Sequence, residues 1–269
     1  MCEDIQIGLI GGGAMAEALI AGLVRSGTKP SHISVSEHKA VRCDELTRTY
    51  GIHAQVGAES FLSRIGVLVL AVKPAAAAAA MMETASLLRE GALVLSIVAG
   101  LTIAEIEAAY PAHPVVRAMP NTPLAVGTGM SAYACGTHAD EGASAVAEML
   151  LGTAGRTARV HEKDLDAVTG LSGSGPAYAF LVLEALIEGG VAAGLKRETA
   201  SLLAAQTLRG AAEMALVSKV SPADLRAAVT SPAGTTAAGL RVLERAGVRS
   251  AFIEAVLAAT ERSRELGRR

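Results

Sequence analysis

A run of three glycines near the start of the chain constrains the fold more than any other feature. Gly11-Gly12-Gly13 directly follow a β-rich segment, Ile5–Ile10, and precede a segment with helical spacing, Ala14–Ser26. Glycine permits the tight turn and the close backbone approach that join a strand to a helix packed behind it. The pattern predicts the first βα unit of an α/β domain.

Strands and helices alternate through the rest of the first half. A short strand at Ile33–Val35 precedes a helix from about Ala40 to Tyr50, and the alanine run Ala75–Ala80 is interpreted as a helix start with no function of its own. Further apolar runs typical of strands occur at 67–72, 93–98, 115–119 and 128–134. Because alternating βα units give a parallel sheet covered on both faces, we predict a Rossmann-type, doubly wound sheet.

The pattern becomes wholly helical after about Arg159. Segments with helical spacing are 176–193, 197–217, 222–229 and 250–266. Pro176–Leu186 is apolar nearly all round, and helices of this kind are buried on most sides. We therefore predict a boundary near residue 160, between a sheet domain and a helical domain, and we expect two or more chains to bury the apolar helices together, as a homodimer or a larger homo-oligomer.

Charge and composition argue against several kinds of partner. The formal net charge is −2, aromatic residues make up 3% of the chain and tryptophan is absent, so we expect no nucleic-acid partner. Cys2, Cys43 and Cys135 fit no metal or redox spacing, and we expect no metal site. The acidic start Met1–Asp4 does not resemble a secretory signal, and apolar runs such as Ala179–Leu183 are too short to cross a bilayer. These observations predict a cytoplasmic protein with no membrane partner.

The glycine run also predicts dinucleotide binding. Gly11-Gly12-Gly13-Ala14-Met15-Ala16 matches G-x-G-x-x-A, and the helix start supplies N–H groups for a pyrophosphate. In doubly wound sheets ligands bind at the carboxyl ends of the strands, where several further residues are expected. The predicted cofactor-binding residues are Ile10, Gly11, Gly12, Gly13, Ala14, Met15, Glu37, Ala71, Val72, Lys73, Pro74, Ala99 and Asn121.

Glu37 bears on which cofactor the chain accepts. It lies 24 residues after Gly13, near the position where an acid binds the ribose hydroxyls of NAD and repels the extra phosphate of NADP. His38, Lys39 and Arg42 follow and have the opposite charge preference. These residues alone leave NAD and NADP both open.

A second ligand-binding pattern lies near the other end of the chain. The loop Thr230–Thr236 contains three threonines, a serine, a proline and a glycine, and it leads into a helical segment, Ala237–Glu244. Free N–H groups at a helix start beside hydroxyl groups can bind a small anion such as a carboxylate. The two patterns together predict a redox enzyme that acts on a small acid.

Five segments carry a resemblance to a known family. They are 11–16, 71–74 (Ala-Val-Lys-Pro), 116–123 (Val-Arg-Ala-Met-Pro-Asn-Thr-Pro), 173–178 (Gly-Ser-Gly-Pro-Ala-Tyr) and 222–244, which contains the threonine loop. In order and spacing the chain resembles pyrroline-5-carboxylate reductases over essentially its whole length. The resemblance implies a dinucleotide-binding Rossmann domain over residues 1–160 and a helical dimerisation and substrate domain over residues 161–269. It also implies NADPH- or NADH-dependent reduction of Δ1-pyrroline-5-carboxylate to L-proline, and it favours NADP slightly while leaving NAD open.

The resemblance also implies roles for individual residues. Ser231, Gly234, Thr235 and Thr236 would bind the substrate carboxylate, with Thr236 facing the ring nitrogen as the catalytic residue. Glu162 would lie near the substrate. The chain departs from the family pattern at Ala233, where a glycine is usual, so we expect a slightly stiffer loop.

Two alternatives remain at this point. One is a related imine reductase acting on a larger cyclic imine acid, and the other is a non-catalytic NAD(P)-binding regulatory protein. A β-hydroxyacid dehydrogenase is disfavoured, because Pro176–Gly190 contains no lysine where that family has a catalytic one. Both threonines of the loop are present, which argues against the regulatory protein.

Overall fold

The computed structural model describes residues 5–267 in two compact units. The sheet unit comprises the described residues up to Ser174 together with those from Ala258 onward, and the helical unit comprises Gly175–Leu257. The predictions made for Cys2 and for the acidic start Met1–Asp4 lie outside the described residues. The domain boundary at residue 160 stays a prediction.

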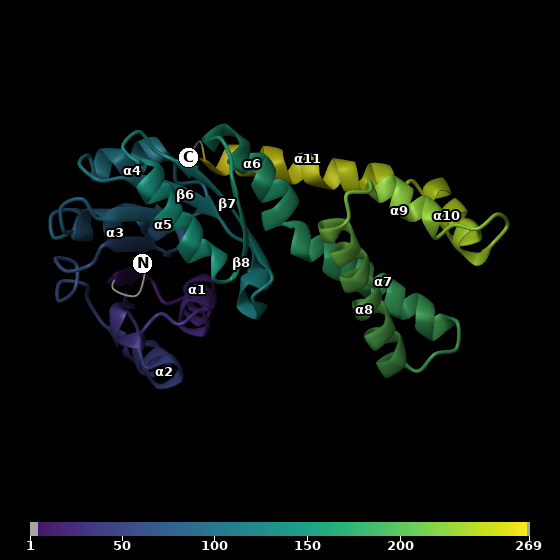
Figure 1. Cartoon of the computed structure of the whole chain (residues 1–269), viewed down its shortest axis with the longest axis horizontal. Coiled ribbons are helices and arrows are strands. Elements are labelled where there is room, and N and C mark those ends of the chain that lie inside the picture. The colour runs from purple at the N-terminus through teal and green to yellow at the C-terminus, as the bar shows by residue number, and fades with distance from the viewer. Residues whose placement is uncertain (1–4, 268–269) are drawn as a thin grey trace. The chain divides into compact units, whose positions relative to one another are not determined.

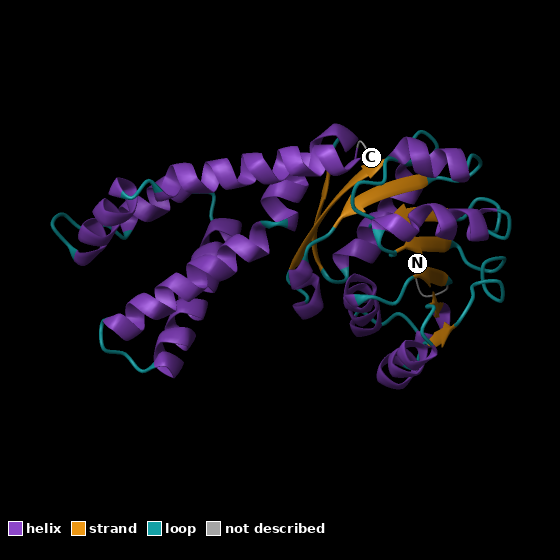
Figure 2. Cartoon of the chain, turned by 180° about the vertical axis from the view of Figure 1, so that it is seen from behind, coloured by secondary structure: helices purple, strands orange, loops and turns teal. Residues whose placement is uncertain are grey.

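One sheet of eight strands forms the centre of the sheet unit, and the fold is of the predicted Rossmann type (Figures 1 and 2). The spatial order of the strands is β3-β2-β1-β4-β5-β6-β7-β8. Their bounds are β1 Ile7–Ile10, β2 Ile33–Ser36, β3 His53–Gln55, β4 Val67–Leu70, β5 Leu93–Ser96, β6 Val115–Met119, β7 Gly129–Cys135 and β8 Gly155–Arg159. The strands from β3 to β6 pair in parallel, which places the carboxyl ends of β1, β2 and β4 at one edge.

Strand β7 departs from the predicted all-parallel arrangement. It pairs antiparallel with β6, and β8 then pairs in parallel with β7. The connection from β6 to β7 is the short 3-10 helix η3, Thr122–Val126, and no crossover helix lies between the two strands. Because parallel neighbours need a long crossover, so short a connection reverses the direction of the chain.

Helices cover both faces of this sheet (Figure 2). Leu9, Val69 and Leu95 pack on one face with side chains of α1, α2 and α5, whereas Leu68 and Val94 pack on the other face with α3 and α4. The helix bounds are α1 Ala14–Arg25, α2 Ala40–Tyr50, α3 Ala77–Ala85, α4 Ile103–Ala109, α5 Glu141–Gly152 and α6 Leu165–Val168. Burial on both faces explains why the inner strands are continuous apolar runs in the sequence.

The helical unit contains no strand among its described residues. Its helices are α7 Gly175–Ala192, α8 Arg197–Val217, α9 Pro222–Ala228, α10 Thr235–Arg245 and the first part of α11, Val248–Gly267. Gly190 of α7 packs against Ala200 of α8. None of the side chains of α7 is buried, and in α8 only Ala200 and Ala204 are. The chain by itself therefore leaves most of the apolar surface of this unit uncovered.

One helix among residues 5–267, Glu162–Ala192, is long and apolar enough to cross a membrane. It is longer than the apolar runs seen in the sequence, because a 3-10 turn, α6, a π-helical turn at Thr169–Gly173 and α7 follow one another without a break. Length and composition do not distinguish a membrane span from a core or interface helix.

Candidate active site

The glycine turn lies between β1 and α1, at the carboxyl edge of the sheet. Gly11 donates its N–H to Ser36 O at the end of β2 (2.8 Å), and Ala71 after β4 donates to Ile10 O (2.9 Å). These bonds join the ends of three neighbouring strands around the turn. Gly13 is the N-cap of α1 in an extended conformation, and no side chain caps the helix. The first N–H groups of α1 are therefore available to an anion.

Side chains would not fit in the first part of this turn. Gly11 has φ +99°, and a Cβ atom there would lie 2.7 Å from the backbone oxygen of Ala71. A Cβ on Gly12 would lie 2.8 Å from Leu46 Cδ1, whereas Gly13 faces open space. The turn is thus a backbone cradle with an open side, which is the form that a pyrophosphate group requires.

Glu37, directly after β2, is held against the glycine turn. Its Oε2 accepts a hydrogen bond from the N–H of Gly12 (2.9 Å), and its Oε1 accepts one from the N–H of Lys39 (3.2 Å). His38 Nδ1 lies 2.6 Å from the same Oε1. Burial raises the pKa of Glu37, but the hydrogen bonds from Gly12 and Lys39 and the nearby His38 ring lower it by more. Glu37 is therefore a fixed carboxylate with a pKa below its ordinary value.

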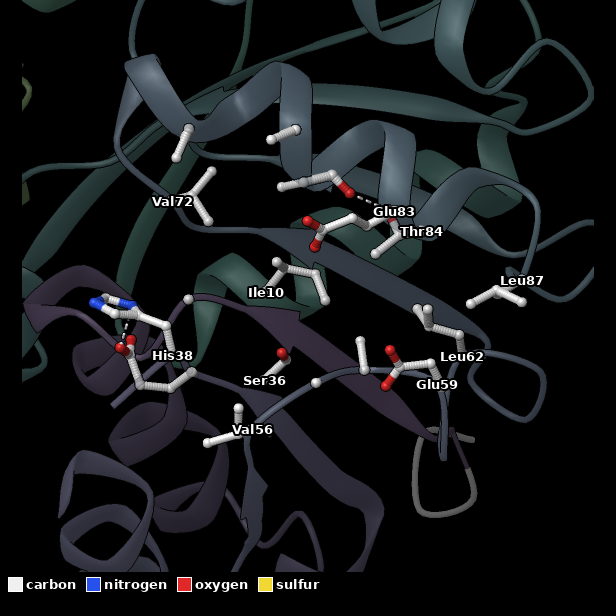
Figure 3. Close-up of a pocket in the computed structure, with 17 residues that line it drawn as sticks. Ile10, Ser36, His38, Val56, Glu59, Leu62, Val72, Glu83, Thr84 and Leu87 are labelled. Atoms are coloured by element: carbon white, nitrogen blue, oxygen red, sulfur yellow. Dashed lines mark hydrogen bonds and ion pairs between the residues drawn. The ribbon is translucent and has the colours of Figure 1, made fainter. Parts of the chain in front are cut away.

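Two cavities meet at Glu37. The larger, about 690 Å³, lies along the glycine turn and is lined by Gly12, Gly13 and Lys73. The smaller, about 410 Å³, is lined by residues of α3 and of the segment after β3 (Figure 3). The residues that line both are Gly11, Glu37, His38, Val72 and Ala76.

The structure brings most of the predicted cofactor residues to these cavities. Those that line one or both are Ile10, Gly11, Gly12, Gly13, Glu37, Ala71, Val72 and Lys73. Ala14 and Met15 begin α1, and Pro74 begins a 3-10 turn directly after Lys73. Ala99 and Asn121 follow β5 and β6 and line neither cavity. The cofactor contacts of these individual residues stay predictions.

Sequence reasoning missed the wall formed by α3. Ala76, Ala79, Ala80, Glu83 and Thr84 line the smaller cavity. The alanine run was interpreted as having no function of its own, but its small side chains leave this space open. The signal in the sequence was the spacing of Ala76, Ala79 and Ala80, which places three small residues on one helix face.

Asn121 uses its side chain inside the protein. Its Oδ1 accepts from the N–H of Met130 (2.8 Å), and its Nδ2 donates to Ser172 O (3.2 Å). Ser172 lies in the π-helical turn, a rare element that often occurs at functional sites. The side chain of Asn121 therefore ties the end of β6 to β7 and to this turn.

Glu162 likewise has protein partners. Its Oε1 accepts from the N–H of Ile103, the first residue of α4 (2.7 Å), and from Arg117 Nη1 (3.0 Å). The side chain of Arg117 is 13% exposed and that of Glu162 is 34% exposed, so this ion pair is partly shielded from water. The contacts join α4, β6 and the 3-10 turn at Glu162–Asp164. A substrate role for Glu162 stays a prediction.

The threonine loop belongs to the helical unit and ends at the start of α10. Gly234 is the N-cap, in an extended conformation, and donates its N–H to Ser231 O (3.1 Å). Ala233 has φ +57°, and among the described residues it is the one non-glycine residue with positive φ. The helix begins at Thr235, two residues earlier than the sequence predicted.

The start of α10 is open to an anion. No side chain caps the helix, and its first turn contains no acidic residue. Ser231, Thr235 and Thr236 are exposed. Free N–H groups, the positive end of the helix dipole and three hydroxyl groups thus lie within six residues, which suits a carboxylate.

Family models match both parts of the chain. Residues 162–266 match the model described as pyrroline-5-carboxylate reductase dimerisation, and residues 6–100 match that of the coenzyme F420-dependent NADP oxidoreductases. The chain is 44% identical to the pyrroline-5-carboxylate reductase of Synechocystis, over 99% of this chain and 100% of that protein. It is 41% identical to the Arabidopsis thaliana enzyme, over 98% and 96% respectively.

Solved structures agree with these matches. The pyrroline-5-carboxylate reductase of Coxiella burnetii has a TM-score of 0.92 and 38% identity, over 97% of this chain and 98% of that one. The pyrroline carboxylate reductase of Plasmodium falciparum, solved with NADP bound, has a TM-score of 0.87 and 30% identity, over 98% and 99%. The similarity therefore covers both the glycine turn and the threonine loop.

Proposed function

The chain belongs to the pyrroline-5-carboxylate reductase family, and on that premise we propose which of its residues carry out the reaction. The protein is an NAD(P)-dependent oxidoreductase that reduces Δ1-pyrroline-5-carboxylate to L-proline, the last step of proline biosynthesis. The observation that carries this function is the similarity over the whole chain, which includes the cofactor and substrate segments alike.

The glycine turn would hold the cofactor. The first N–H groups of α1, at Ala14 and Met15, would bind the pyrophosphate, and the glycine backbone from Gly11 to Gly13 would leave room for its close approach. When bound, NAD(P)H supplies a hydride to the C=N carbon of the substrate. Lys73, exposed after β4, is placed to add a positive charge beside the larger cavity.

The threonine loop would hold the substrate. The N–H groups of Thr235 and Thr236 at the start of α10 would bind the carboxylate together with the Ser231 hydroxyl, while the Gly234 N–H closes the loop onto Ser231 O. Thr236 would hydrogen-bond the ring nitrogen and orient the C=N bond. A protonated imine is already a good electrophile, so positioning is the main task left to the protein.

Glu162 is proposed as a more distant contributor. Both hydrogen bonds to its carboxylate end on Oε1, its Oε2 accepts none from the described residues 5–267, and the side chain is 34% exposed. A carboxylate in this state can stabilise the positive charge of a protonated ring nitrogen. If so, Glu162→Gln raises KM for the imine without changing the affinity for NAD(P)H.

Substitution of Thr236 tests the substrate site directly. Thr236→Ala is expected to lower kcat/KM for pyrroline-5-carboxylate by roughly tenfold or more, the scale of about 1.4 kcal/mol for a lost positioning contact. Thr236→Ser keeps the hydroxyl and serves as the matched control. Unchanged steady-state kinetics in the alanine variant would remove Thr236 from the mechanism.

We further propose that the protein is a cytoplasmic homodimer, with no nucleic-acid or membrane partner. The match to a dimerisation model supports a homo-oligomer, and the net charge of −2 is unfavourable for nucleic acid. Sedimentation velocity of the purified protein would measure the number of subunits. A monomer at micromolar concentration would contradict this assembly.

No observation favours the alternative functions. An assay of NAD(P)H oxidation with pyrroline-5-carboxylate and with its six-membered analogue distinguishes them from the proposed reaction. The five-membered substrate is expected to give the higher kcat/KM. A preference for the larger ring would instead indicate the related imine reductase, and no turnover with either would indicate a binding protein.

A further inference from the structure

We propose that this enzyme selects NADH over NADPH, because Glu37 holds a fixed carboxylate where the adenosine ribose of the cofactor binds. The inference rests on the proposed use of NAD(P)H and adds which of the two cofactors the chain accepts. It departs from the slight preference for NADP that the family resemblance suggested. Four features of the sheet unit support it.

The first feature is the place of Glu37 between the two cavities. The larger cavity follows the glycine turn, where a pyrophosphate is cradled, and the smaller lies between α3 and the segment after β3. In a dinucleotide the adenosine ribose joins the pyrophosphate to the adenine. A cofactor with its pyrophosphate in the larger cavity and its adenine in the smaller one has this ribose at their junction. Glu37 lines both cavities, so it lies at that junction.

The second feature is that the Glu37 carboxylate is fixed. It is held by the N–H groups of Gly12 (2.9 Å) and Lys39 (3.2 Å), and the residue is only 9% exposed. A long acidic side chain on the surface can swing away from an incoming anion. Glu37 cannot do so without giving up its hydrogen bonds to the turn that binds the cofactor.

The third feature is that two of the three nearby basic side chains, Arg42 and His38, are already paired with carboxylates. Arg42 donates through Nε to Gly12 O (3.0 Å), and its two terminal nitrogens pair with Glu17 (2.5 Å) and Glu45 (3.1 Å). His38 pairs with Glu37 itself. In the part of the chain that the structure describes, Lys39 is the one of these three basic residues that forms no ion pair. The arrangement thus lacks the free arginine that usually accommodates a 2′-phosphate.

The fourth feature is the charge of the smaller cavity. Glu37, Glu59 and Glu83 line it, and His38 is the one residue of its described lining that can carry a positive charge. Figure 3 shows the Glu59 and Glu83 side chains at the cavity, Glu83 from α3 and Glu59 from the segment after β3. A 2′-phosphate adds up to two negative charges next to these carboxylates, whereas a free 2′-hydroxyl can donate a hydrogen bond to Glu37.

Binding of cofactor fragments tests the proposal without any turnover. Calorimetric titration of the full-length protein with ADP-ribose and with 2′-phospho-ADP-ribose, at one low salt concentration, measures the ratio of their Kd values. The wild-type protein is expected to bind ADP-ribose at least about tenfold more tightly. Equal affinities, or tighter binding of the phosphorylated fragment, would overturn the proposal.

Two variants identify the responsible residue. Glu37→Gln keeps an oxygen acceptor for the Gly12 N–H but removes the charge, and it is expected to reduce the ratio to about threefold or less. Asp44→Asn is the matched control, because it removes one exposed negative charge from α2 at a residue that lines neither cavity. The control is expected to keep the wild-type ratio. An unchanged ratio in Glu37→Gln, or the same reduction in both variants, would contradict the role of Glu37.

The two proposals fail in different ways. If neither fragment binds, the cofactor site is misplaced and the selectivity proposal falls with it. If ADP-ribose binds selectively but pyrroline-5-carboxylate is not reduced, the proposed function fails while the selectivity stands. Steady-state kcat/KM with NADH and with NADPH is then expected to follow the same order as the fragment affinities.

Discussion

The sheet unit and the helical unit differ in how far each buries its own apolar side chains. In the sheet unit Leu9 and Leu95 are fully buried between two layers of helices. In the helical unit α7 has no buried side chain, and Phe180 and Leu202 are 61% and 71% exposed. A sheet covered on both faces completes its own core, whereas a few apolar helices need another surface. One chain therefore contains a unit that buries its own core and a unit whose apolar surface needs a partner.

The two units nevertheless offer ligands the same backbone device. The N-cap of α1, Gly13, has φ −71° and ψ −179°, and the N-cap of α10, Gly234, has φ −76° and ψ 173°. Neither helix has a side-chain cap. They differ in what surrounds them, because Glu17 lies in the first turn of α1 and is neutralised by Arg42, whereas the first turn of α10 contains no acid. The turn that leads into α1 packs against the strand ends at Gly11 and Gly12, whereas the loop that leads into α10 is exposed.

The largest expected effect comes from placing a charge on the uncovered helices. Phe180→Glu should dissociate the homo-oligomer, because burying an unpaired carboxylate in place of a phenyl ring costs roughly 3 kcal/mol or more. Sedimentation velocity would then show monomers at concentrations where the wild type is assembled. Met82→Glu is the control, since Met82 is 81% exposed in the sheet unit and lines neither cavity. If Met82→Glu also gave monomers, the effect of Phe180→Glu could not be assigned to the uncovered surface of the helical unit.

The next largest effect is expected from adding a side chain to the glycines that precede α1 and α10. Gly11→Ala should destabilise the protein by about 2 kcal/mol and abolish cofactor binding, because its Cβ would lie 2.7 Å from the fixed backbone oxygen of Ala71 at a positive φ. Gly234→Ala should lower kcat/KM yet barely change stability, because the nearest atom is Ser231 Oγ on an exposed loop. Thermal unfolding together with NADH binding measures both. Equal losses of stability in Gly11→Ala and Gly234→Ala would show that the turn before α1 is no more tightly packed than the loop before α10.

A smaller effect concerns the pH dependence of the Glu37 contact. The pKa of Glu37 is below its ordinary value of 4.5 in the folded protein, so the contact stabilises the fold fully above that value. The stabilisation is lost as the pH falls through the lower folded value. The wild type should therefore exceed Glu37→Gln by about 1 kcal/mol in unfolding free energy at pH 7. Chemical denaturation at pH 7 and below pH 4 tests this, and a gap that widens in acid would contradict it.

The smallest effect is at Ala233. At its φ of +57°, an alanine is strained by about 1 kcal/mol, and a glycine would not be. Glycine also gives the unfolded chain more conformations, which lowers the free energy of unfolding by about 0.4–1 kcal/mol. Ala233→Gly should thus leave stability unchanged or raise it by up to about 1 kcal/mol. Ala246→Gly is the control, because Ala246 has φ −78° and should lose stability. Equal losses in thermal unfolding would show that Ala233 is unstrained.

Local patterns in the sequence predicted most elements of both units. The helix Ala40–Tyr50, the helix Arg197–Val217 and the strand Val115–Met119 have the predicted bounds. Strands β3 and β8 were missed, because β3 has only three residues and β8 carries two exposed arginines. The antiparallel direction of β7 was also missed, since direction depends on the path of the connection and not on the strand's own residues. The Rossmann-type fold class was confirmed.

In the candidate site, too, local patterns predicted some features and the tertiary structure determined others. Glycine spacing and strand ends predicted Gly11–Gly13, Ala71 and Lys73, which the structure brings to one cavity. The positive φ of Ala233 and the helix start at Thr235 were not foreseen, although the sequence did single out Ala233. Asn121 bonds to Ser172, 51 residues distant in the chain, and Glu162 bonds to Arg117 and Ile103, 45 and 59 residues distant, so no local pattern could reveal these contacts.

By itself, the sequence determined the elements that depend on near neighbours: the glycine turn, the apolar strands, the alanine-rich helix and the threonine loop. The family also followed from these, because their order and spacing are written along the chain. Only the tertiary structure decided where Glu37 directs its carboxylate and which cations remain free. Those properties arise from backbone groups and ion pairs that the fold brings together, such as Gly12 with Glu37 and Arg42 with Glu17. Charge in a sequence can be counted, but its effect on a ligand depends on what already neutralises it.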